Sequence, residues 1–145
     1  MRVNELLKIK GGPLITIGPN ETVLAAIQKL VENNIGAFPV CNAKGNILGI
    51  VSERDLLTEC SQHSNAIDRT KVKDVMTKDV VVGIAGDDVD HVASTMIQKG
   101  IRHLPIMVGP ELEGVISMRD IVEAQLEQSK AELRALSDYM LGGDS

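Results

Sequence analysis

The amino-acid sequence predicts an α+β fold built from two copies of one small unit. A phrase of Gly, apolar residues, Ser, any residue, Arg, Asp and two apolar residues occurs twice, as GNILGIVSERDLL ending at Leu57 and LEGVISMRDIV ending at Val122. The segments before the two phrases also correspond, because NIGAFPV (34–40) matches GIRHLPI (100–106) at an offset of 66 residues. Such self-similarity indicates two structural units of one design.

Each unit is predicted to run strand, helix, strand, turn, strand, helix. In the first unit, LITI (14–17) is the expected first strand, and Asn20 is the expected N-cap of a helix that ends near Asn33. A hairpin follows, with strands AFPV (37–40) and ILGIVS (47–52). The second helix begins at the Ser-x-Arg-Asp turn.

The second unit repeats this order, with Gly86-Asp87-Asp88 opening its first helix. In the first helix of both units, apolar residues recur at i, i+3, i+4, i+7 and i+8, which predicts one buried face per helix. The polar segment 61–71 joins the units. Units of about 60 residues are marginal on their own, so we expect them to share one core. The residues of the two apolar faces are Val23, Ala26, Ile27, Leu30 and Val31, and Val89, Val92, Ala93, Met96 and Ile97.

Composition argues against several classes of function. The formal net charge of −5 disfavours a broad nucleic-acid or anionic-membrane surface, and with Phe38, Tyr139 and no Trp there is little material for stacking bases. No apolar run reaches the ~18–20 residues of a membrane span, and the N-terminus lacks the pattern of a signal peptide. Cys41 and Cys60 are isolated, as is typical of small buried residues in a reducing compartment. We therefore expect a cytoplasmic protein with no nucleic-acid or membrane partner.

The Ser-x-Arg-Asp turn has two interpretations. Ser followed three residues later by Asp resembles a capping box, which alone explains Ser52 with Asp55 and Ser117 with Asp120. An Arg in the first helical turn of both units opposes the helix dipole, so helix stability does not explain it. In the second interpretation, the helix N-terminus, the Ser hydroxyl and the Arg guanidinium bind a phosphate, while the carboxylate accepts the hydroxyls of a ribose. P-loop and Rossmann glycine motifs do not occur, which argues against those two nucleotide-binding classes.

The paired phrases GIVSERD and GVISMRD, together with RHLPI and the DVMT between the units, resemble a pair of CBS domains, also called a Bateman module. The resemblance covers roughly residues 8–126 and is closest to small stand-alone CBS-pair proteins. It implies two repeats of order β-α-β-β-α, at 8–60 and 74–126, packed about a pseudo-two-fold axis with two related clefts. A linker (61–73) and a C-terminal helical tail (127–145) complete the expected organisation.

Members of this family bind adenosine nucleotides in the clefts, including AMP, ADP, ATP, NAD and S-adenosylmethionine. The resemblance implies that Asp holds the ribose, that Ser and Arg hold the phosphate, and that apolar residues contact the adenine. By this carry-over, one cleft uses Ser117, Arg119, Asp120 and His103 with Ile15 and Ile35, and its mate uses Ser52, Arg54 and Asp55 with Val81 and Ile101.

The two expected clefts are unequal. The first repeat has Gly36-Ala37 where the second has Arg102-His103, so Ala37 is the candidate at the place of His103 in the mate cleft. The cleft around Asp120 should therefore offer more cationic groups to a phosphate and bind more tightly. His103 is either a ligand group or a partly buried histidine, and both interpretations stay open.

These inferences predict a non-catalytic, adenine-nucleotide-binding regulatory module that senses energy or redox state by a ligand-dependent conformational shift. AMP is the first candidate ligand, and no catalytic cofactor or metal is expected. The alternative is a protein-interaction module that regulates a metabolic or redox enzyme, with vestigial clefts. A short heptad-like seam in the tail packs either on its own domain or, as we favour, in a homodimer; the regulated partner is not identified. The seam comprises Val122, Leu126, Leu133, Leu136 and Met140.

Overall fold

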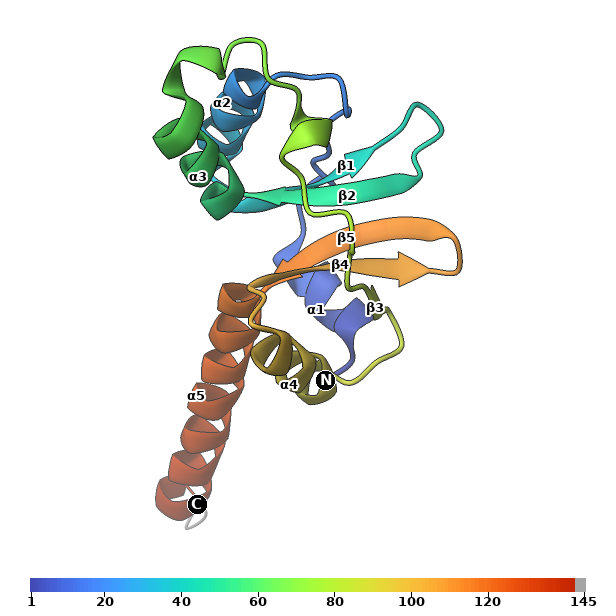
Figure 1. The fold of residues 1–145 in the computed structure, drawn as a ribbon. Coiled ribbons are helices and arrows are strands. Elements are labelled where there is room, and N and C mark those ends of the chain that lie inside the picture. The colour runs from blue at the N-terminus through green and yellow to red at the C-terminus, as the bar shows by residue number, and fades with distance from the viewer. Residues whose placement is uncertain (143–145) are drawn as a thin grey trace.

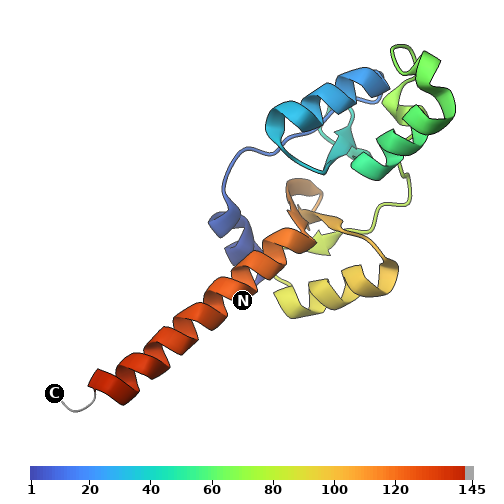
Figure 2. The ribbon, with the colours of Figure 1, turned by 90° about the vertical axis from the view of Figure 1, so that its left-hand side faces the viewer.

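The computed structural model describes residues 1–142 and shows the two predicted units, so the α+β fold of two repeats is confirmed. In both units the hairpin lies toward the middle of the molecule and the helices lie outside it (Figures 1 and 2). The elements are α1 (Val3–Lys10), α2 (Val23–Asn33), β1 (Ala37–Cys41), β2 (Ile47–Ser52), α3 (Glu53–His63), the short 3-10 helices η1 (Ser64–Ala66) and η2 (Val72–Asp74), β3 (Gly83–Ile84), α4 (Val89–Lys99), β4 (His103–Val108), β5 (Glu111–Ser117) and α5 (Met118–Gly142).

The hairpins of the two units repeat each other in register. β1 pairs antiparallel with β2, which brings Ala37 opposite Ser52, and β4 pairs antiparallel with β5, which brings His103 opposite Ser117. β3 adds a parallel strand to the second hairpin only. One backbone hydrogen bond also recurs, from Glu53 N–H to the Gly36 carbonyl (2.9 Å) and from Met118 N–H to the Arg102 carbonyl (2.8 Å). The end of each hairpin is thus tied to the helix that follows it in the same way.

The start of the first unit differs from the prediction in two details. Thr22, not Asn20, caps α2, because the helix begins at Val23 and the Thr22 hydroxyl accepts the Ala25 N–H (3.0 Å). Segment 14–17 is not a strand, since only Ile17 makes a parallel bridge, to Val40. Its two hydrogen bonds, from Ile17 N–H to the Pro39 carbonyl and from Cys41 N–H to the Ile17 carbonyl, hold a single point of contact.

The prediction of one shared core is wrong, because the buried apolar residues form two separate clusters, one per unit. The N-terminal helix α1, which was not among the predicted elements, explains how the second unit forms a core of its own. Val3 and Leu6 of α1 are buried in its cluster. In the first unit, Val72 of η2 closes the cluster. Each core therefore gains apolar area from a segment outside the repeated pattern. The clusters are Ile17, Val23, Ala26, Leu30, Phe38, Val40, Val51, Leu56 and Val72, and Val3, Leu6, Val89, Val92, Met96, Leu104, Ile106, Ile116 and Ile121.

The outer helices leave apolar residues uncovered. Val31 and Ile97, equivalent members of the predicted buried faces, are 75% and 70% exposed, so that part of the prediction is wrong. α5 runs as one helix from Met118 to Gly142 and extends away from the body of the second unit (Figure 2). The sequence LGGDS (141–145) is typical of a frayed end, but Leu141 and Gly142 belong to this helix; residues 143–145 lie outside the described part of the chain. Within residues 1–142, no helix combines the length and apolar character needed to cross a membrane.

Candidate functional site

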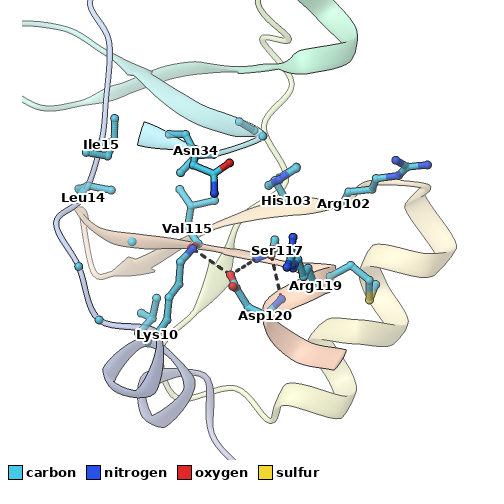
Figure 3. A pocket seen from close by; sticks show the side chains of 18 of the residues that line it. Lys10, Leu14, Ile15, Asn34, Arg102, His103, Val115, Ser117, Arg119 and Asp120 are labelled. Carbon is cyan, nitrogen blue, oxygen red and sulfur yellow. Dashed lines mark hydrogen bonds and ion pairs between the residues drawn. The ribbon is translucent and has the colours of Figure 1, made fainter. Parts of the chain in front are cut away.

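A cavity of about 620 Å³ lies between the two units, on the side of the Asp120 turn. Its walls come from three parts of the chain: the end of α1 with the loop that follows it, the first unit around the start of β1, and the second unit around β4, β5 and the start of α5 (Figure 3). The lining residues from these parts are Leu7, Lys10, Gly11, Gly12, Pro13, Leu14 and Ile15; Asn34, Ile35, Gly36, Ala37 and Glu53; and Arg102, His103, Glu113, Gly114, Val115, Ser117, Met118, Arg119, Asp120 and Glu123.

The structure brings together all seven residues expected in the cleft around Asp120. Eight of the predicted site residues line this cavity: Ile15, Ile35, Ala37, Arg102, His103, Ser117, Arg119 and Asp120. Ala37, expected in the mate cleft, is among them. The remaining five, Ser52, Arg54, Asp55, Val81 and Ile101, line neither this cavity nor the second one described below. Val81 and Ile101 instead pack against the core of the second unit.

Both Ser-x-Arg-Asp turns are capping boxes, as the structural interpretation predicts. In the second unit, the Asp120 N–H donates to Ser117 Oγ (3.0 Å) and the Ser117 N–H donates to Asp120 Oδ2 (2.8 Å). In the first unit, the corresponding distances between Ser52 and Asp55 are 3.3 Å and 2.9 Å. Capping therefore accounts for Ser and Asp at both places, and only the surroundings distinguish the two turns.

Lys10 is the main difference between the two turns. Its ammonium lies 3.0 Å from Asp120 Oδ2 and also donates to the Val115 carbonyl. Among residues 1–142, Asp55 has no ion-pair partner. The sequence analysis missed Lys10 because it missed α1. Its signal was present, however, since Val3, Leu6 and Leu7 in VNELLKIK follow the i, i+3, i+4 spacing of a short amphipathic helix.

Two groups of the cavity have shifted pKa values. Burial lowers the pKa of His103, Lys10 lowers it further, and the carboxylates of Asp120 and Glu53 do not restore it. His103 is therefore neutral near pH 7. For Asp120, burial is the largest influence and raises the pKa, but the hydrogen bonds from Ser117 and Lys10 together outweigh it, so the pKa lies below its ordinary value. Asp120 is thus an ionised acceptor near neutral pH, which suits it to bind hydroxyl groups.

The two arginines at the cavity face outward. The Arg119 guanidinium is bound to Glu123 (Nε to Oε1, 2.9 Å), and its side chain is 85% exposed. Arg102 extends away from Asp120 (Figure 3). In this structure Lys10 is the cation that contacts Asp120.

A second cavity of about 460 Å³ is an apolar groove on the outer side of the first unit, between α2 and α3. It shares Asn34, Ile35 and Glu53 with the first cavity. With few polar groups and no cation, it lacks the features that recognise a phosphate. Its other lining residues are Ile27, Leu30, Val31, Leu56, Leu57 and Cys60.

Comparison with known proteins agrees with the fold and the repeat. The profile of the CBS domain matches twice, at residues 8–61 and 72–127. The uncharacterized protein MK0525 of Methanopyrus kandleri is 31% identical over 113 residues, which are 77% of this chain but only 58% of that protein. Among solved structures, the CBS-domain containing protein ATU1752 from Agrobacterium tumefaciens is 34% identical with a TM-score of 0.82, covering 86% of this chain and 99% of that one.

Two further structures of similar fold were solved with ligands. The CBS domain protein PAE2072 from Pyrobaculum aerophilum, in complex with AMP, is 25% identical with a TM-score of 0.75 and covers 83% of this chain and 89% of its own. The CBS domain pair of protein MJ0100, in complex with 5′-methylthioadenosine and S-adenosyl-L-methionine, is 25% identical with a TM-score of 0.77 and covers 90% and 98%. Because the two matches together cover most of the chain, the chain belongs to the CBS domain family and carries two CBS domains in tandem.

Proposed function

We propose that the protein is a non-catalytic regulatory module that binds an adenine nucleotide in the cavity at Asp120, with AMP as the first candidate. The observation that carries this proposal is the cavity itself, which joins an ionised acceptor for ribose hydroxyls, a helix N-terminus at Ser117 and apolar walls at Ile15 and Ile35. Similar CBS-pair structures hold AMP, or 5′-methylthioadenosine with S-adenosyl-L-methionine, which supports an adenosine ligand.

The same cavity suggests how a ligand would act. Residues of both units line it, while each unit has its own buried core. A ligand in the cavity therefore contacts two bodies that are packed independently, and it stabilises the arrangement in which both contacts are made. Its effect on the equilibrium equals its difference in affinity for the two arrangements.

Calorimetric titration of the purified, nucleotide-stripped protein with AMP, ADP, ATP, NAD and S-adenosylmethionine tests this proposal. We expect AMP to bind at one site per chain, since one of the two turns adjoins the cavity. If none of these ligands binds and the protein instead captures a defined enzyme with unchanged affinity in their presence, the alternative of an interaction module with vestigial clefts is the better description.

The pH dependence of AMP binding should reveal His103. The neutral imidazole is faced by Lys10 from α1, Glu53 from α3, Asp120 from α5 and the adjacent Arg102. A bound phosphate adds negative charge and raises the pKa of His103, so the complex holds more protons than the free protein and binding tightens as the pH falls. Between pH 8 and pH 6, we expect the affinity of the wild type to rise relative to that of His103→Gln by about fivefold.

Titration of AMP itself affects both proteins equally, so calorimetry at both pH values should be read as the ratio of their dissociation constants. A ratio that does not change with pH would mean that the phosphate lies away from His103.

We also propose that the protein is a homodimer and that α5 forms its interface. The tail seam has no cover in the single chain, because Leu133, Leu136 and Met140 are 66%, 56% and 70% exposed. From Val122 to Met140 the seam is about 27 Å long. The stripe follows alternating 4-3 spacing with Ser129 as its single polar position, and such a stripe fits the same stripe on a second copy.

The double variant Leu133→Ser, Leu136→Ser should dissociate such a dimer, because both leucines lose their apolar contacts in both chains. We expect dimer affinity to fall by more than about 100-fold, measured by light scattering after size exclusion and by sedimentation equilibrium. Ala131→Ser, Ala135→Ser, on exposed positions off the seam, is the matched control. The proposal fails if the leucine variant keeps the mass of the wild type.

A further inference from the structure

We infer that Lys10 sets the charge of the ligand that the cavity accepts, by favouring an adenosine ligand with a phosphate over a neutral or cationic one. This inference rests on the proposed function. It concerns a residue outside the repeated Ser-x-Arg-Asp turn, at the end of a helix that comes before the first unit in sequence but packs against the second.

The cavity has little positive charge to spare. Four carboxylates line it (Glu53, Glu113, Asp120 and Glu123), against three cations (Lys10, Arg102 and Arg119). His103 adds no charge near pH 7, since its pKa is lowered. Of the three cations, Arg119 is already bound to Glu123. Without Lys10, the excess of carboxylates over cations would double, and Asp120 would lose the cation that pairs with it.

Lys10 is held in place by the fold. α1 is fixed to the second unit by buried Val3 and Leu6, and by backbone hydrogen bonds from Val3 N–H to the Asp87 carbonyl and from Asn4 N–H to the Ala85 carbonyl (both 2.9 Å). The Lys10 ammonium then meets Asp120 Oδ2 and the Val115 carbonyl (Figure 3). Because an ammonium has three hydrogens, it keeps one to donate to a ligand.

Comparison of the two repeats indicates that a lysine is not needed at this place for folding. Met76 packs over Gly49 in the first unit as Leu7 packs over Gly114 in the second, and among residues 1–142 no lysine pairs with Asp55, yet the Asp55 turn forms its capping box. Ile50 stands opposite Pro39 in the first hairpin as Val115 stands opposite Pro105 in the second, and the Ile50 carbonyl accepts the backbone N–H of Thr77 (2.9 Å). The second unit replaces this arrangement with a charged side chain that reaches into a cavity. A function of Lys10 in ligand binding explains the difference.

The size of the effect follows from the distance between the charges. If Asp120 binds the ribose, the 5′-phosphate lies within about 10 Å of the Lys10 ammonium. At that separation a unit charge in a partly buried site changes the affinity for an anion by about tenfold. A neutral adenosine derivative feels no such change, and the positively charged S-adenosylmethionine feels the opposite one.

The test compares Lys10→Met with Lys10→Arg and the wild type, by calorimetry with AMP, 5′-methylthioadenosine and S-adenosylmethionine. Lys10→Met should bind AMP about tenfold more weakly and 5′-methylthioadenosine with an affinity within about threefold of the wild type, while S-adenosylmethionine binds more tightly. Lys10→Arg keeps the charge and should keep the preference for AMP. Raising the salt concentration should reduce the difference between wild type and Lys10→Met for AMP.

Two results would overturn the inference. If Lys10→Met weakens the binding of AMP and of 5′-methylthioadenosine by the same factor, Lys10 maintains the shape of the cavity and does not select the charge of the ligand. If it changes neither affinity, Lys10 does not act on the ligand at all. A wild type that binds none of the three ligands is a different result, because it refutes the proposed function and the inference with it. Thermal unfolding of all three proteins, followed by circular dichroism, separates lost binding from lost folding.

Discussion

Replacing Asp120 by alanine should weaken AMP binding by about 100-fold or more, whereas Asp55→Ala should leave it within about twofold. The Asp120 carboxylate lines the cavity and is ionised near neutral pH, so it can accept hydrogen bonds from both hydroxyls of a ribose. Hydrogen bonds to a charged group contribute about 1.5–3 kcal/mol each, and a loss of about 2.7 kcal/mol corresponds to 100-fold. Asp55 lines neither cavity.

The two variants form a matched pair, because both carboxylates close a capping box at the start of a helix. Asp55 accepts the Ser52 N–H (2.9 Å), and Asp120 accepts the Ser117 N–H (2.8 Å). Loss of either box should cost about 1 kcal/mol of stability, measured by urea unfolding. Calorimetry then shows whether AMP affinity depends on the capping box, which both variants lose, or on a carboxylate in the cavity, which Asp120→Ala alone loses. Equal weakening of AMP binding by both variants would mean that the effect passes through the helices and would refute a site at Asp120.

The repeat was predictable because its chemistry is local. Both hairpins and both capping boxes depend on residues within one turn or one strand pair, and the two copies confirm each other. The Gly of each phrase, in contrast, has a reason that is not local and that only the structure shows. A Cβ on Gly49 would lie 2.7 Å from Met76 Sδ, and a Cβ on Gly114 would lie 2.9 Å from Leu7 Cδ2. In each unit, a segment far away in the sequence packs where a side chain would otherwise stand.

The part that Lys10 plays in the inequality of the two turns could not be predicted from the turns themselves. The sequence predicts that Arg102 and His103 make the difference, and both line the cavity, but without a ligand Arg102 extends away from Asp120 and His103 is neutral near pH 7. The structure shows a further difference between the two units, in the segments that lie beside β2 and β5. Thr77 exchanges two backbone hydrogen bonds with Ile50 (2.9 and 3.0 Å), which holds that segment against β2. Beside β5, the long side chain of Lys10 takes the place of such a bond, and the cavity lies there.

The spacing of apolar residues also could not predict how much of each outer helix is buried. The spacing of Val31 and Ile97 is the same whether an apolar face is covered by its own unit or left for another molecule. Both residues are exposed, at equivalent positions of α2 and α4. A repeat that leaves the same position uncovered twice fits a chain whose outer surface meets a partner.

Phe38→Ala should have the largest effect on stability, lowering the free energy of unfolding by about 3–5 kcal/mol. Phe38 is the single phenylalanine of the chain, lies fully buried in the cluster of the first unit, and pairs with Val51 across the hairpin. The first cluster contains no other aromatic side chain, so its neighbours are aliphatic residues that cannot fill the space a phenyl ring leaves. Urea unfolding followed by circular dichroism measures the loss, and Val31→Ala, at an exposed position, should stay within about 0.5 kcal/mol.

Separate cores give this variant a second expected result. Because Phe38 contributes to the cluster of the first unit only, the loss of stability should be confined to that unit. Urea unfolding of Phe38→Ala should therefore show two transitions, with the second unit unfolding at a higher urea concentration than the first. AMP binding should be lost in the first transition, since Ile35, Gly36 and Ala37 line the cavity from the first unit. A single transition with undiminished slope would show that the two cores, although separate in space, unfold as one cooperative body. The contacts between the two units would then contribute to the stability of both, and a ligand that rearranges one unit against the other would have to offset the loss of those contacts.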